Sequence, residues 1–136
     1  MATVNLVRGG TSLHAGRSNK AVPHVVERVV DFSATSNAAG DVFQVLAVPA
    51  GTLVAKAGVE VLTVGTGTGT VALGDGTNTY SAASALTSAG FLAVSATTNI
   101  LYGTADTLDL TVATAAVNAK IRVWAVLTDL DGVNAE

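Results

Sequence analysis

From residue 25 onward, short apolar stretches alternate with turns that contain glycine or proline. The segment 107–113 places Leu108 and Leu110 on one face and polar residues between them, which is the period of a half-buried strand. Residues 119–127 continue this alternation over a longer distance. About eight such stretches occur without alternating helices between them, which predicts an all-β fold, either a β-sandwich or a jelly-roll-like barrel.

The predicted strands share β-branched or alternating apolar residues and are bounded by turn residues; they span 25–32, 41–48, 59–64, 71–73, 77–80, 91–95, 100–102, 107–113 and 119–127. The second of them is apolar on both faces, which predicts a buried central strand. The segment 81–89 is the single helix candidate, because Ser81 can cap its start and Gly90 its end. We therefore expect at most one short helix.

The chain divides into three parts by composition: an extended N-terminal arm over 1–24, a β-sandwich domain over 25–130 and a polar tail over 131–136. A Gly-Gly pair prevents a stable helix in the arm, and Pro23 restricts its end. No stretch has the roughly 20 apolar residues of a membrane-spanning helix. The N-terminus lacks the apolar core of a signal peptide, so no membrane partner is expected.

Charge is distributed unevenly along the chain, whose formal net charge is −3. The bases Arg8, Arg17, Lys20 and Arg28 lie near the N-terminus, where Glu27 is the one acid among them. One interpretation is a solvated, flexible tail, and the other is an arm that contacts an acidic partner surface. Direct nucleic-acid binding is not expected, because the arm has no aromatic residue for base stacking and the whole chain is acidic.

Candidate catalytic and metal-binding residues are few. Cysteine is absent, which excludes disulfides and cysteine-ligated metals. His14 and His24 lie in the arm, where no rigid partner orients them, and the Gly/Thr repeat 65–70 lacks the lysine of a phosphate-binding loop. The candidate ligands for a cation are the carboxylates of Asp75, Asp106 and Asp109, which come from separate predicted loops and strands. We therefore expect a protein that is not an enzyme and has no cofactor.

Arg122 and Trp124 lie on the polar face of the last predicted strand. Trp124 is either covered by a loop or serves as an anchor in a subunit contact, since tryptophan and arginine are enriched at interface hot spots. Only 12% of the residues are charged, about half the usual share of a soluble domain. A surface built from Thr, Ser, Asn and Gly suits a protein that sits in an assembly.

Several segments carry a resemblance to a known group; they are 51–62, 71–77 (Val-Ala-Leu-Gly-Asp-Gly-Thr), 86–90 (Leu-Thr-Ser-Ala-Gly), 105–111 and 120–127 (Lys-Ile-Arg-Val-Trp-Ala-Val-Leu). Over about residues 40–130 the chain resembles small structural proteins of tailed bacteriophages, including capsid decoration (cement) proteins. The resemblance implies a β-sandwich, often a homotrimer, on the outer capsid surface of the virion. It would bridge subunits of the major capsid protein, and it transfers no catalytic residue.

Two other functions compete with this interpretation. A tail or fibre module that binds a host receptor or glycan would use the Gly/Thr repeat together with Tyr80 and Tyr102, although only 4% of the residues are aromatic. A hydrolase on a β-scaffold would need a triad, a metal set or an acid pair, and none is recognisable in the sequence.

Overall fold

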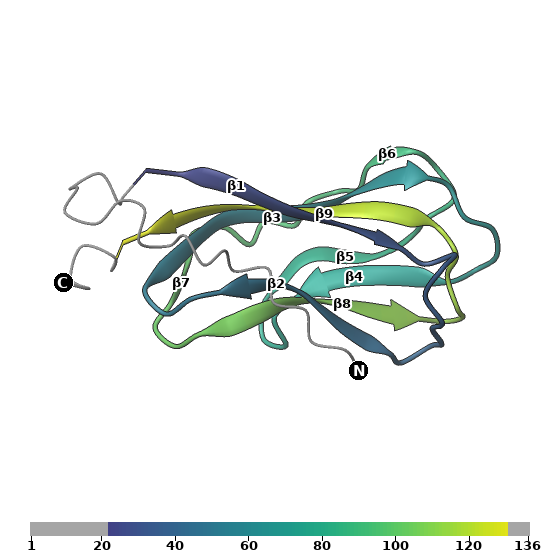
Figure 1. The fold of residues 1–136 in the computed structure, drawn as a ribbon, viewed down its shortest axis with the longest axis horizontal. Coiled ribbons are helices and arrows are strands. Elements are labelled where there is room, and N and C mark those ends of the chain that lie inside the picture. The colour runs from purple at the N-terminus through teal and green to yellow at the C-terminus, as the bar shows by residue number, and fades with distance from the viewer. Residues whose placement is uncertain (1–21, 131–136) are drawn as a thin grey trace.

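The computed structural model describes residues 22–130, which form nine strands in two antiparallel sheets and, within that range, no helix (Figure 1). The strands are β1 His24–Asp31, β2 Val42–Val48, β3 Thr52–Thr63, β4 Thr70–Gly74, β5 Thr79–Ala85, β6 Gly90–Phe91, β7 Ile100–Tyr102, β8 Asp106–Ala113 and β9 Lys120–Asp129. The predicted all-β architecture is confirmed.

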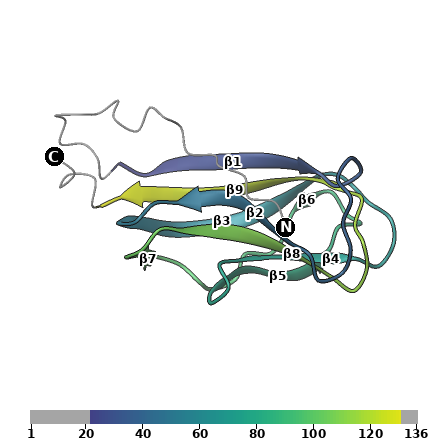
Figure 2. The same ribbon diagram turned by 60° about the horizontal axis from the view of Figure 1, so that its bottom comes forward.

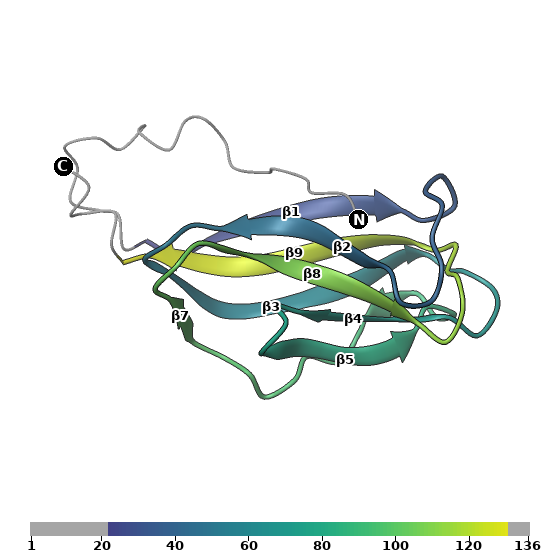
Figure 3. The ribbon, with the colours of Figure 1, turned by 90° about the horizontal axis from the view of Figure 1, so that it is seen from below.

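The two sheets pack face to face as a β-sandwich. The five-stranded sheet has the order β1-β9-β3-β6, with β7 also paired to β3, and the four-stranded sheet has the order β2-β8-β4-β5. Figure 1 shows β1, β9 and β3 in one layer and β2, β8 and β4 in the other, and Figure 3 shows the same layers from below. The inward side chains of both sheets form one core, as the alternation in 107–113 and 119–127 predicts.

The long strand β3 organises the five-stranded sheet. One edge of β3 pairs with β9 along most of its length. Its other edge pairs with β7 at one end and with β6 at the other, and Figure 2 shows these two short strands far apart. The outer face of this sheet consequently has β9 at its centre and β1 as one edge.

The helix predicted over 81–89 is wrong, because Thr79–Ala85 forms the edge strand β5. Tyr80 and Ser81 are both fully buried there, and β5 pairs with β4 across register shifts. The caps and alanines provide only a weak local preference for helix, and strand pairing with burial of a tyrosine overrides it.

The prediction of a central strand at 41–48 is also wrong in position, since β2 is the outermost strand of the four-stranded sheet. A register shift between Gln44 and Leu46 places the consecutive residues Val45 and Leu46 in the core together. A β-bulge therefore explains why the segment is apolar on both faces. Of the segment predicted as strand 91–95, only Phe91 lies in a strand, as the second residue of β6.

Candidate functional site

Arg122 and Trp124 lie on the outer face of β9, in the middle of the five-stranded sheet. Their neighbours Ile121, Val123 and Ala125 are fully buried in the core, so the alternation along β9 directs the two polar-face residues outward. The sequence predicts both residues on the outward, polar face of this strand, and the structure places both of them there.

The indole ring of Trp124 packs closely against Gly58 of the neighbouring strand. Gly58 of β3 lies directly opposite it in register, and a Cβ atom built on Gly58 would be 2.6 Å from the indole Cζ2 and 2.8 Å from Cε2. Only glycine leaves room for the ring at this position. The indole Nε1 is shielded from solvent and has no hydrogen-bond acceptor among the described residues.

Arg122 connects three strands through two carboxylates. Its Nε lies 2.9 Å from Oε1 of Glu27 on β1, and its Nη1 lies 2.7 Å from Oε1 of Glu60 on β3. Both pairs are partly exposed, so each contributes little to stability by itself. Their main effect is to fix the guanidinium beside Trp124. One guanidinium and two carboxylates leave a net charge of −1, which Lys56 on the same face of β3 balances.

Exposed apolar side chains surround this centre. Val25 is 63% exposed and Phe91 70% exposed, and Val29 and Leu101 are also largely exposed. The strand registers place all four on the outer side of the five-stranded sheet. We call this surface the contact face; it consists of Val25, Glu27 and Val29 of β1, Arg122, Trp124 and Val126 of β9, Lys56, Gly58 and Glu60 of β3, and Phe91 and Leu101.

The residues predicted for the basic arm are placed differently. Arg8, Arg17 and Lys20 lie outside the described residues, as does His14. Arg28 lies within β1, paired with the inward-facing Val123, and is therefore half-buried on the opposite side of β1 from the contact face.

A buried polar cluster escaped the sequence analysis. The hydroxyl of Tyr102 donates a hydrogen bond to Oδ2 of Asp75 at 2.5 Å, and its oxygen lies 2.7 Å from the hydroxyl of Tyr80. Asp75 also accepts hydrogen bonds from the backbone of Thr77 and from Asn78. The cluster ties β7 to the turn between β4 and β5, so these tyrosines stabilise the fold.

The carboxyl groups of Asp75 and Asp109 have pKa values that are shifted in opposite directions. Partial burial raises the pKa of Asp75, but the hydrogen bonds from Asn78, Tyr102 and Thr77 outweigh it and hold that pKa below its usual range. Burial raises the pKa of Asp109, although Thr107 donates a hydrogen bond to it, and the charges of Asp106 and Asp75 raise it further. Burial also raises the pKa of Tyr102.

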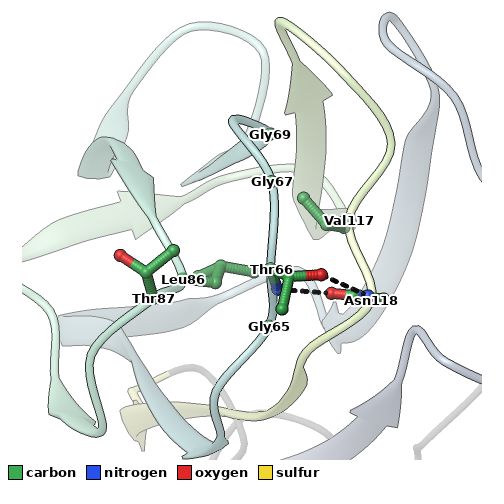
Figure 4. Close-up of a pocket in the computed structure, with 8 residues that line it drawn as sticks. All are labelled: Gly65, Thr66, Gly67, Gly69, Leu86, Thr87, Val117 and Asn118. Atoms are coloured by element: carbon green, nitrogen blue, oxygen red, sulfur yellow. Dashed lines mark hydrogen bonds between the residues drawn. The ribbon is translucent and has the colours of Figure 1, made fainter.

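The Gly/Thr repeat forms the loop between β3 and β4, where it lines a shallow pocket (Figure 4). Oδ1 of Asn118 accepts a hydrogen bond from the backbone N–H of Thr66 at 2.9 Å, and its Nδ2 donates to the hydroxyl of Thr66 at 3.1 Å. This loop crosses from one sheet to the other, because β3 and β4 belong to different sheets, and the β8–β9 connection holds it in place.

Within residues 22–130, no group of three or more His, Asp or Glu side chains lies close enough together to hold a metal ion. Asp75, Asp106 and Asp109 therefore do not form a cation site in this structure. No helix long and apolar enough to cross a membrane occurs in the part of the chain that the structure describes.

Sequence reasoning missed Glu27, Lys56 and Glu60 as parts of the contact face, because their neighbours across the sheet come from distant segments. Gly58 did carry a signal, since a glycine inside an alternating strand marks a close approach of another group.

Comparison with known proteins gives no match: no protein-family model, no curated protein and no solved structure is significantly similar to the chain.

Proposed function

We propose that the chain is a non-enzymatic structural protein of a tailed-phage virion, which decorates the outer capsid surface and bridges subunits of the major capsid protein. The contact face is the observation that carries this proposal. It gathers Trp124 and the exposed Val25, Val29 and Phe91 on one side of a sheet whose other side forms the core. An exposed apolar surface of this kind on a small protein marks an interaction site.

The basic arm supplies the second element of the proposal. Residues 1–21 contain Arg8, Arg17 and Lys20 and no acid, so the arm complements an acidic capsid surface. Many weak attachments suffice on a capsid, because repetition over the lattice increases the overall avidity. The homotrimer that the sequence resemblance implies stays a prediction.

Cosedimentation with capsids that lack their decoration protein tests the proposal. We expect the full-length chain to pellet with capsids, the deletion of residues 1–21 to bind much more weakly, and salt to weaken binding by screening the arm. A chain of full length in which Arg8, Arg17 and Lys20 are all replaced by Gln is the matched control, because it separates charge from length. Failure of the full-length chain to pellet with any undecorated capsid would refute the proposal.

The alternative of a glycan-binding tail module loses its two aromatic candidates. Tyr80 is fully buried and Tyr102 is 6% exposed, so neither ring is available to stack on a sugar. Retention of the full-length protein on host cells or on a glycan array, without binding to capsids, would nevertheless favour that alternative.

A further inference from the structure

Strand β1 has an open edge that sets it apart from the other outer strands of the sandwich. Its eight residues pair with β9 in one unbroken register, and no described strand pairs with its other side (Figure 2). The other edges are interrupted or short: β2 carries a bulge, Ser95 donates hydrogen bonds to the carbonyls of Thr79 and Tyr80 on β5, and β6 and β7 have two and three residues. A long, regular edge is a template for a further strand.

The hydrogen bonds to β9 show which backbone groups of β1 remain open. The amide of Phe32 donates to the carbonyl of Ala119, and the register repeats this pairing at every second residue, so the even-numbered residues of β1 bond to β9. The backbone groups of the odd-numbered residues Val25, Glu27 and Val29 consequently point away from β9. The side chains of these three residues lie on the contact face, so a strand added at this edge would extend that face.

The side chains along β1 restrict which strand can be added. Glu27 is the middle residue of the open edge, and its side chain is 58% exposed although it pairs with Arg122. An incoming strand should therefore place a base opposite Glu27 and an apolar residue opposite Val29, which is 45% exposed. The β1 strand of a second copy does not meet this requirement, because none of its outward side chains is a base.

The N-terminal segment 3–8, Thr-Val-Asn-Leu-Val-Arg, has the required pattern. It lies outside the described residues, is rich in residues that favour strands, and is followed by a Gly-Gly pair at which the chain can turn. In the antiparallel register that places Arg8 opposite Glu27, Leu6 lies opposite Val29. The remaining pairs bring no like charges together; they are Val4 with Asp31, Asn5 with Val30 and Val7 with Arg28.

Other antiparallel registers lose the charge pair. A shift by two residues in either direction places Arg8 opposite a valine of β1, either Val25 or Val29. A shift by one residue moves Arg8 to the other side of the sheet, where Arg28 lies. The charges of β1 therefore select one register for this segment.

We propose that residues 3–8 pair as an antiparallel strand with the open edge of β1 in the same chain, with Arg8 opposite Glu27. Residues 9–23 then form the connection, whose closure entropy rises only slowly with its length. This tether holds the segment at a high effective concentration beside its own β1, which favours the same chain over a second copy as the donor.

The pairing is compatible with the proposed function and does not rest on it. The added strand lies beside β1, so the outer side chains of β9 and β3 stay accessible. Arg8 would lie at the margin of the contact face, and Arg17 and Lys20 would lie in the connection. The bases of the arm would thus stay next to the surface that we propose to contact the capsid.

Amide hydrogen exchange, measured by NMR on the full-length protein, tests this pairing residue by residue. We expect the amides of Glu27 and Val29 to exchange at least about tenfold more slowly than in an unstructured chain, because they donate to Arg8 and Leu6. Leu6→Pro should abolish this protection, since it removes the amide that donates to the carbonyl of Val29. Val7→Pro is the matched control and should keep the protection, because in this register the amide of residue 7 points away from β1.

The protection should also be independent of protein concentration, because the donor segment belongs to the same chain. Circular dichroism verifies that both variants are folded. Unprotected amides at Glu27 and Val29 in the unaltered protein, protection that survives Leu6→Pro, loss of protection in Val7→Pro, or protection that disappears on dilution would each overturn the inference. These measurements involve no capsid, so a failure of this pairing is distinguishable from a failure of the capsid proposal.

Discussion

The packing of Trp124 on Gly58 leads to a quantitative prediction for Gly58→Ala. A methyl group at residue 58 would lie 2.6 Å from Cζ2 of the indole ring, about 1 Å inside the ordinary carbon–carbon contact of about 3.5–4.0 Å. The nearest atoms all belong to the large, rigid indole ring of Trp124, the residue that pairs with Gly58 on the neighbouring strand. The ring must therefore tilt outward, away from β3.

The expected cost follows from two opposing effects. Overpacking of this size destabilises a protein by about 1–3 kcal/mol. Alanine offsets about 0.5–1 kcal/mol of this, because glycine in a strand loses more backbone entropy on folding. We therefore expect Gly58→Ala to lower the free energy of unfolding by about 1–2 kcal/mol.

Urea denaturation followed by far-ultraviolet circular dichroism measures this cost in four proteins: the unaltered chain, Gly58→Ala, Trp124→Ala and the double variant. Without the ring, Gly58→Ala should be neutral or stabilising, which corresponds to a coupling of about 1 kcal/mol or more between the two positions. The emission of Trp124, the one tryptophan in the chain, should also shift to longer wavelength in Gly58→Ala. An equal cost in both backgrounds, with unchanged emission, would refute the proposed contact.

Three further predictions concern the polar contacts away from the contact face. Tyr102→Phe should lower the free energy of unfolding by about 1–3 kcal/mol, because it leaves the buried hydroxyl of Tyr80 without its acceptor. Tyr80→Phe should lower it by only about 0.5–1.5 kcal/mol in the same denaturation assay. Equal costs for the two variants would contradict the assignment of Tyr80 as the donor to Tyr102. Asn118→Ala removes both side-chain hydrogen bonds to Thr66, so hydrogen exchange should accelerate at the Thr66 amide but not in β9. Because the pKa of Asp75 is lowered in the folded state, its contribution to stability is present above the unfolded pKa of about 4 and is lost as the pH falls through the lower folded pKa. When the free energy of unfolding is measured across a pH series, Asp75→Asn should therefore reduce the loss of stability on the acid side. An unchanged loss of stability in acid would contradict this prediction.

Local sequence pattern determined which side of each strand faces the core. In β9 the alternation alone places Arg122 and Trp124 on the same outer face, because successive strand residues point to opposite sides. The same reasoning located β1, β4, β7 and β8 to within a few residues, but it found only the second half of β3, which begins at Thr52 and not at Val59. It failed at residues 81–89, where helix caps and alanines gave a weak local preference that pairing with β4 overrode.

Only the tertiary structure decided which strands lie side by side. β9 inserts between β1 and β3, so Arg122 meets Glu27 and Glu60, and Trp124 meets Gly58, across long separations in the sequence. The hydrogen bonds that join Tyr102 of β7 to Asp75 and to Tyr80 of β5 depend on the same kind of long-range contact. The alternation of inward and outward side chains is a local property of each strand, so it carries no information about which strands are its neighbours. Strand order is selected by the burial and backbone pairing of the whole sandwich.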